Sequence, residues 1–218
     1  MSVIACLQQW FVEVAKSASL TDVKSIRKHI LMGLLLAIPI TARPQSIIAN
    51  RPALTDRGHV EGATYSNATL GFNYQLPQGF FVNPMPDNLP PASLLLMIAD
   101  THNGTPWRDR IILVADDATK NSWTTSEYVT HFVRSMPAKL NTVVLRDTYP
   151  LKVAGKEFFG IDYQKTEEGR NLYQTFLCTQ LKGYFVSWTF TSLDKKRLGE
   201  LTASVNTIVL DAASSKAR

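Results

Sequence analysis

The sequence predicts an α+β domain in which one antiparallel β-sheet is flanked by helices, as in an α/β/α sandwich. Two observations point to this class. Across residues 63–210, short runs of alternating apolar and polar residues are separated by turns, several of which contain glycine. Two segments instead repeat their apolar residues at helical spacing, and each follows a group of strand-like runs. Strands joined by short turns pair antiparallel, and the helices then pack on the sheet.

The first half of this region contains three predicted strands. Residues 70–76 (LGFNYQL) alternate, and a turn at Pro77–Gly79 ends them. The prolines between Pro84 and Pro91 predict a loop that cannot join a sheet ladder. Residues 92–100 (ASLLLMIAD) and 108–117 (RDRIILVADD) are two more apolar runs of strand length, separated by a polar turn.

A first helix is predicted near Thr125–Met136. Thr124 and Glu127 have the spacing of a capping box, and the residues that follow place their apolar side chains on one stripe. Pro137 ends this helix, because proline cannot continue the hydrogen-bond ladder.

Four strand-like runs and a second helix complete the domain. The runs cover residues 141–149, 156–164, 171–181 and 184–192. The dipeptide Lys182–Gly183 between the last two runs is typical of a tight hairpin. A helix near Asp194–Ile208 follows, with its apolar residues on one side.

The order of these elements resembles the PsbP-like α/β/α sandwich superfamily. The resemblance spans roughly residues 65–210 and rests on LGFNYQLPQGF, the capped helix, the hairpin PLKVAGKEFFGIDYQ, the hairpin around Lys182–Gly183 and the closing helix. It implies the sandwich fold. It also implies a non-catalytic domain, because the superfamily is largely non-catalytic and includes lumenal PsbP proteins of photosystem II and small exported or lipid-anchored bacterial proteins. No plant-type transit peptide is visible, so a photosystem role is not implied.

The segment KSIRKHILMGLLLAIPITARPQS, residues 24–46, has the layout of a bacterial secretory signal. A basic head precedes an uncharged apolar run, and Ala42 is the small residue before a cleavage between Ala42 and Arg43. The run is shorter than the roughly 20 residues that span a bilayer. A buried core helix is the alternative, and Pro39 near the end of the run argues against it.

This signal-like segment sets the predicted domain organisation. Residues 1–42 form an N-terminal extension plus the segment, and a GTG start codon at Val23 would place the signal at the N-terminus. Residues 43–62 are expected to form a flexible tether, residues 63–210 a single α/β domain and residues 211–218 a disordered tail. We expect an exported protein, periplasmic or secreted, that contacts a membrane only through the signal. If the signal is not cleaved, it anchors the protein to the inner membrane.

Composition and charge limit the possible partners. The chain is 45% hydrophobic and 19% charged, which favours a folded domain over a disordered one. The net charge of +5 falls to +3 without residues 1–42, because that segment carries four basic and two acidic residues. A charge this small, without basic clusters, argues against nucleic acid. The expected partner is therefore a protein or a small molecule.

The chain lacks the sequence motifs of the common catalytic classes. No G-x-S-x-G, G-x-G-x-x-G, P-loop, H-E-x-x-H or C-x-x-C occurs, so we expect no catalytic residue, no cofactor and no bound metal. The histidines are His29, His59, His102 and His131. None has a second ligand at helical or turn spacing. Asp116 and Asp117 are consecutive in a strand and point to opposite faces, and Cys178 lies in an alternating run typical of a buried cysteine.

Two classes of function remain open. The favoured one is an exported, non-catalytic domain that binds a protein or small-molecule partner in the cell envelope. The alternative is a hydrolase-like envelope enzyme with its site in residues 101–117. A pocket that gathers two or more of His102, Asp109, Asp116 and Asp117 would indicate the enzyme. An exposed apolar patch near Pro84–Pro91 would indicate a partner surface.

The signal hypothesis predicts the outcome of a fusion experiment. Residues 1–46 joined to a reporter that is active only outside the cytoplasm should give activity. Replacing Leu35 and Leu36 by aspartate should abolish it, because each charge costs about 2.5–3.5 kcal/mol at the centre of an inserted helix. Activity that survives both substitutions would mean that another feature delivers the protein.

Overall fold

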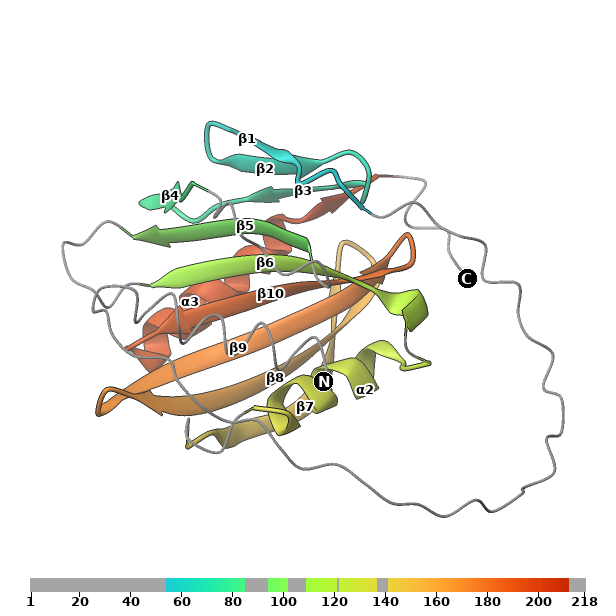
Figure 1. Ribbon diagram of the computed structural model, residues 1–218. Coiled ribbons are helices and arrows are strands. Elements are labelled where there is room, and N and C mark those ends of the chain that lie inside the picture. Colours follow the sequence, from blue (N-terminus) through green and yellow to red (C-terminus); the bar gives the residue numbers. More distant parts are fainter. Residues whose placement is uncertain (1–53, 85–93, 102–108, 121, 137–140, 212–218) are drawn as a thin grey trace, which may run out of the picture.

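The computed structural model describes residues 54–84, 94–101, 109–120, 122–136 and 141–211. A seven-stranded antiparallel sheet with the order β4-β5-β6-β10-β9-β8-β7 forms its centre (Figure 1). Its strands are β4 (Phe80–Val82), β5 (Leu94–Thr101), β6 (Arg110–Asp117), β7 (Val143–Val153), β8 (Lys156–Glu167), β9 (Arg170–Leu181) and β10 (Tyr184–Ser192).

A second, small sheet and two helices complete the described fold. The small sheet has the order β1-β2-β3-β11, with β1 (His59–Glu61), β2 (Thr64–Asn67), β3 (Phe72–Gln75) and β11 (Val209–Leu210). The helices are α2 (Thr125–Arg134) and α3 (Lys195–Ala203), and the short 3₁₀ turns are η1 (Ala118–Lys120) and η3 (Ser204–Thr207). Among the residues described, no helix is long and apolar enough to cross a membrane.

The two faces of the large sheet are covered by different elements. Trp188 of β10 belongs to a buried cluster that joins the large sheet to the small sheet and α3. Phe185 of the same strand belongs to a second cluster, which α2 covers. Because even and odd residues of a strand point to opposite faces, α2 and α3 lie on opposite sides of the sheet, as Figure 1 shows. This arrangement confirms the predicted α+β sandwich.

Trp188 lies at the centre of the larger cluster and is fully buried. Its ring meets Phe72 and Tyr74 of β3 edge-on, with centroids 5.5 and 6.4 Å apart. On its own sheet it packs against Phe158 of β8, 5.7 Å away. The aromatic side chains therefore hold the small sheet on the large one, and the alternation predicted for residues 70–76 supplies two of them.

The local signals for the helix starts and the last hairpin are confirmed. Thr124 and Glu127 form the predicted capping box at α2. Asp194 caps α3 by accepting hydrogen bonds from the backbone N–H groups of the next turn. Lys182 and Gly183 both have positive φ, 46° and 83°, as the tight turn between β9 and β10 requires.

The second helix is shorter than the sequence predicts. We expected it near Asp194–Ile208, but α3 ends at Ala203 and is followed by η3 and β11. Hydroxyl groups redirect the chain: Ser204 Oγ hydrogen bonds to Tyr74 at 2.6 Å, and Thr207 Oγ1 donates to the carbonyls of Ser204 and Gln75. These bonds fasten the end of the helix to β3, and β11 then pairs with that strand.

The predicted boundaries of the domain are also displaced. The tether was expected to reach residue 62, yet His59–Glu61 form β1 and pair with β2. The Asp56 carboxylate fixes the preceding turn by accepting hydrogen bonds from Gly58 N and Thr69 Oγ1. Asp211, assigned to the tail, donates its backbone N–H to the Gly71 carbonyl. Residues 1–53 and 212–218 lie outside the described residues, and with them the signal segment and the Ala42–Arg43 cleavage.

The central position of Trp188 predicts a large loss of stability on truncation. Trp188→Ala should lower the free energy of unfolding by about 3–5 kcal/mol, because it leaves a cavity between the sheets. The matched control is Phe81→Ala on β4, where the ring is 58% exposed. It should change stability by only about 0.5 kcal/mol. Urea unfolding of both variants tests this, and similar midpoints for the two would contradict the assignment of the core.

Candidate functional site

The residues of the enzyme alternative are not brought together by the described structure. Asp109 precedes β6, whereas Asp116 and Asp117 end it. A strand of that length separates them by about 20 Å, since each residue advances roughly 3.3 Å. His102, with the rest of residues 102–108, lies outside the described residues. Among the residues that the structure does describe, no three His, Cys, Asp or Glu side chains lie close enough to hold a metal ion.

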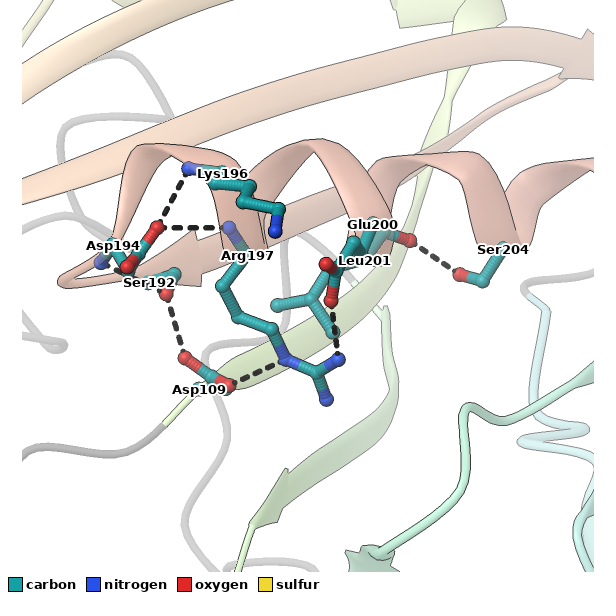
Figure 2. Close-up of polar contacts among 8 residues, drawn as sticks. All are labelled: Asp109, Ser192, Asp194, Lys196, Arg197, Glu200, Leu201 and Ser204. Atoms are coloured by element: carbon teal, nitrogen blue, oxygen red, sulfur yellow. Dashed lines mark hydrogen bonds and ion pairs between the residues drawn. The ribbon is translucent and has the colours of Figure 1, made fainter.

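Asp109 connects the start of β6 to α3 (Figure 2). Its Oδ1 accepts a hydrogen bond from Ser192 Oγ at 2.7 Å, and its Oδ2 accepts one from Arg197 Nε at 3.1 Å. Arg197 also donates to Glu200 at 2.9 Å. The hydrogen bonds to Glu200 and Asp109 raise the pKa of the Arg197 guanidinium above its ordinary value. Asp109 therefore holds a helix on the sheet.

The two carboxylates at the end of β6 have separate partners. Asp116 accepts a hydrogen bond from the hydroxyl of Tyr128 on α2. Asp117 Oδ1 accepts from the backbone N–H and the hydroxyl of Thr119 in η1. Burial raises the pKa of Tyr128, and the negative charge of Asp116 adds to the shift. Both aspartates therefore stabilise the local structure.

Cys178 and the two described histidines occupy the positions that the sequence indicates. Cys178 is fully buried beneath α2, and burial raises the pKa of its thiol, as expected for a structural cysteine. His131 is half-buried on α2 and lies against the ring of Trp123, with centroids 4.3 Å apart. His59 is exposed on β1.

Exposed apolar side chains gather on both edge strands of the large sheet. On β4, Phe81 is 58% and Val82 37% exposed, directly before the proline-rich segment singled out in the sequence. Pro84 is exposed, and residues 85–93 lie outside the described residues. On β7, the consecutive residues Val143, Val144 and Leu145 are 53%, 45% and 41% exposed. We call these three residues the β7 patch.

Two register shifts interrupt the pairing of β7 with β8 immediately after the β7 patch. The shifts lie between Val144 and Arg146 and between Arg146 and Tyr149. As a result, Val143 pairs with Gln164, Arg146 with Asp162 and Tyr149 with Gly160. These three partners are alternate residues of β8. Alternate strand residues share a face, so these three side chains of β7 lie on the same side of the sheet edge.

Tyr149 is held firmly on this side of the sheet. Its hydroxyl donates to Asp162 Oδ1 at 3.0 Å, and Thr175 Oγ1 donates to the same oxygen at 2.8 Å. Gly160 leaves room for its ring, because a Cβ at Gly160 would lie 2.7 Å from the ring. Burial raises the pKa of Tyr149, and the nearby Asp162 carboxylate adds to the shift, so Tyr149 stays a hydrogen-bond donor at neutral pH.

This edge site is not evident from the sequence alone. Residues 141–149 have the pattern of a strand, but nothing in that pattern singles out individual side chains. Two signals were present: VVL does not alternate, and Pro150, directly after the predicted strand and before Leu151, is typical of an edge strand. The placement of Arg146 and Tyr149 on one side could not be predicted, because it depends on bulges that become visible only in the paired sheet.

The fold, with α2 and α3 on opposite faces of the large sheet, is like that of a solved PsbP structure, which agrees with the fold that the resemblance implies. Among solved structures, it is similar to cyanobacterial PsbP (CyanoP) from Synechocystis sp. PCC 6803, with a TM-score of 0.51 and 9% identity over 70% of this chain and 96% of that chain. At this identity the likeness shows the fold alone.

Two further structures are similar at lower scores. LpqN, involved in cell envelope biogenesis of Mycobacterium tuberculosis, has a TM-score of 0.42 and 12% identity over 64% of this chain and 83% of that chain. The protein of unknown function PA94 from Pseudomonas aeruginosa has a TM-score of 0.42 and 17% identity over 60% of this chain and 96% of that chain. No protein-family model matches the chain, and no curated protein matches its sequence.

The structural role of Asp109 predicts a stability effect. Asp109→Ala should lower the free energy of unfolding by about 1–3 kcal/mol, because Ser192 and Arg197 lose their acceptor. The matched control is Glu200→Ala, which removes only the exposed partner of Arg197 and should cost at most about 1 kcal/mol. Urea titration of both variants measures the difference. An Asp109 variant that keeps its full stability but loses its biological role would instead support the enzyme alternative.

Proposed function

We propose that this chain is an exported, non-catalytic domain that binds a partner in the cell envelope, and that a protein partner docks on the β7 patch. The main observation that supports this proposal is the exposure of three consecutive apolar residues on an edge strand. Side chains of a strand alternate between faces, so a covered face normally hides every second one. Val143 and Val144 pair with consecutive residues of β8, so they lie on opposite sides of the edge and both sides expose an apolar side chain. Single exposed apolar residues are ordinary, but apolar exposure on both sides of one edge indicates an interaction surface.

The β7 patch lies between two contacts with the α2 region. The hydroxyls of Thr130 on α2 and Thr148 on β7 are hydrogen bonded, 2.7 Å apart. Before the patch, Thr142 Oγ1 donates to the sulfur of Met136, which follows α2, at 3.5 Å. Val143–Leu145 lie between these contacts and are exposed.

The edge of β7 is poorly suited to the addition of another strand. Its two register shifts disturb the ladder, and Pro150 has no backbone N–H to donate. Bulges and prolines are the features by which sheet edges resist strand addition. A partner is therefore expected to bind the side chains of the β7 patch rather than to extend the sheet.

The proposal of export rests on the sequence of residues 24–46, with its basic head and apolar run. The enzyme alternative has less support from the described residues. Asp109, Asp116 and Asp117 each bind groups of the fold, and β6 separates the first from the other two.

Capture from envelope extract by two matched variants tests the docking site. The double variant Val144→Asp, Leu145→Asp should lose a protein that the wild type retains, because the partner's apolar side chains would face two charges. Val209→Asp is the control, since Val209 is 60% exposed on β11 of the other sheet. It should retain the partner. Equal retention by the double variant and the wild type, at equal melting temperatures, would contradict the proposal.

A further inference from the structure

We propose that the partner segment recognised at β7 carries an acidic side chain beside its apolar residues, and that Arg146 selects this acidic group. The inference rests on the proposed function, which places the partner on the β7 patch. It adds the charge of the partner segment and the residue of this chain, Arg146, that binds the charged group.

The Arg146 side chain is ordered by the ring beneath it. Its guanidinium carbon lies 3.6 Å from the centroid of the Tyr149 ring, a cation–π contact. That ring is fixed by its hydrogen bond to Asp162 and by its packing over Gly160. An arginine on a fixed aromatic ring loses less side-chain entropy when it binds a ligand than a freely moving one does. Arg146 is therefore preorganised although it is exposed.

Apart from its contact with the Tyr149 ring, Arg146 takes no part in the ion pairs that join basic and acidic groups among the described residues. Its register partner Asp162 accepts hydrogen bonds from Tyr149 and Thr175 instead. A guanidinium stacked by its face keeps the N–H groups of its edge for a carboxylate, which it can bind through two parallel hydrogen bonds.

The guanidinium of Arg146 lies on the same side of the sheet edge as one apolar residue of the β7 patch. Val143 and Arg146 lie on the same side of the edge, three positions apart, because of the bulge between them. A partner segment that covers Val143 with an apolar side chain would therefore meet Arg146 with a neighbouring one. Arginine and tyrosine are also among the residues that contribute most at protein interfaces. The complementary side chain for Arg146 is aspartate or glutamate.

Asp147 provides a matched control for the charge of Arg146. It follows Arg146 directly, is exposed, and its Oδ1 accepts a hydrogen bond from Thr148 N at 2.7 Å. If charge alone in this region governed binding, removing Asp147 and removing Arg146 would have opposite effects of similar size. If Arg146 is the recognition residue, its replacement has the larger effect.

Two fluorescent eight-residue peptides provide the probe, one alternating valine with glutamate and one alternating valine with lysine. Their fluorescence anisotropy is measured with the full-length protein at low salt. The wild type should bind the glutamate peptide at least about tenfold more tightly than the lysine peptide, and high salt should reduce this ratio. Arg146→Glu should reverse the preference, whereas Asp147→Asn should keep or increase it. Tyr149→Leu should reduce it, because the guanidinium loses its support.

The outcomes separate this inference from the proposed function. The variant Val143→Asp should bind neither peptide, because it removes the apolar contact on the side that Arg146 shares. If that variant loses binding while Arg146→Glu keeps the preference for glutamate, the docking site stands and the acidic selectivity is wrong. A wild-type protein that binds the two peptides equally, or does not bind the glutamate peptide, would also overturn the inference.

Discussion

The contact of Trp188 with the small sheet is the interaction on which the rest of this structure depends. Its ring packs against β3 on one side and against Phe158 of its own sheet on the other. The small sheet and α3 pack on this face of the large sheet, while α2 covers part of the opposite face. With its faces used for the core, the sheet presents its exposed apolar side chains mainly at its edges, on β4 and β7. The core thus determines where apolar side chains remain exposed.

The bulges of β7 serve two purposes at once. They disturb the ladder at an open edge, which protects the domain from indiscriminate pairing with other strands. They also bring Val143, Arg146 and Tyr149 to one side, which a regular strand would not do. The same irregularity therefore prevents one kind of association and creates the surface proposed for another. The acidic residues that first suggested chemistry have a different role, since Asp109 and Asp116 attach α3 and α2 to the sheet.

Local patterns in the sequence predicted most of the fold. The alternation of residues 70–76, the capping box at Thr124 and the Lys182–Gly183 turn are each determined within a few residues. Features that depend on distant contacts could not be predicted in this way. His59–Glu61 form a strand only because β2 lies beside them, and the end of α3 is set by a hydroxyl contact with Tyr74. The candidate site belongs to this second group, because its side chains meet through register shifts between two strands.

Photo-crosslinking in intact cells tests the central claim most directly. A photoreactive amino acid is placed at position 144 on the β7 patch or at position 209 on the small sheet, both of which are exposed in the domain. The account predicts a covalent adduct with one envelope protein from position 144 and none from position 209. Adducts from position 209 but not from position 144 would show that the partner binds elsewhere and would contradict the account.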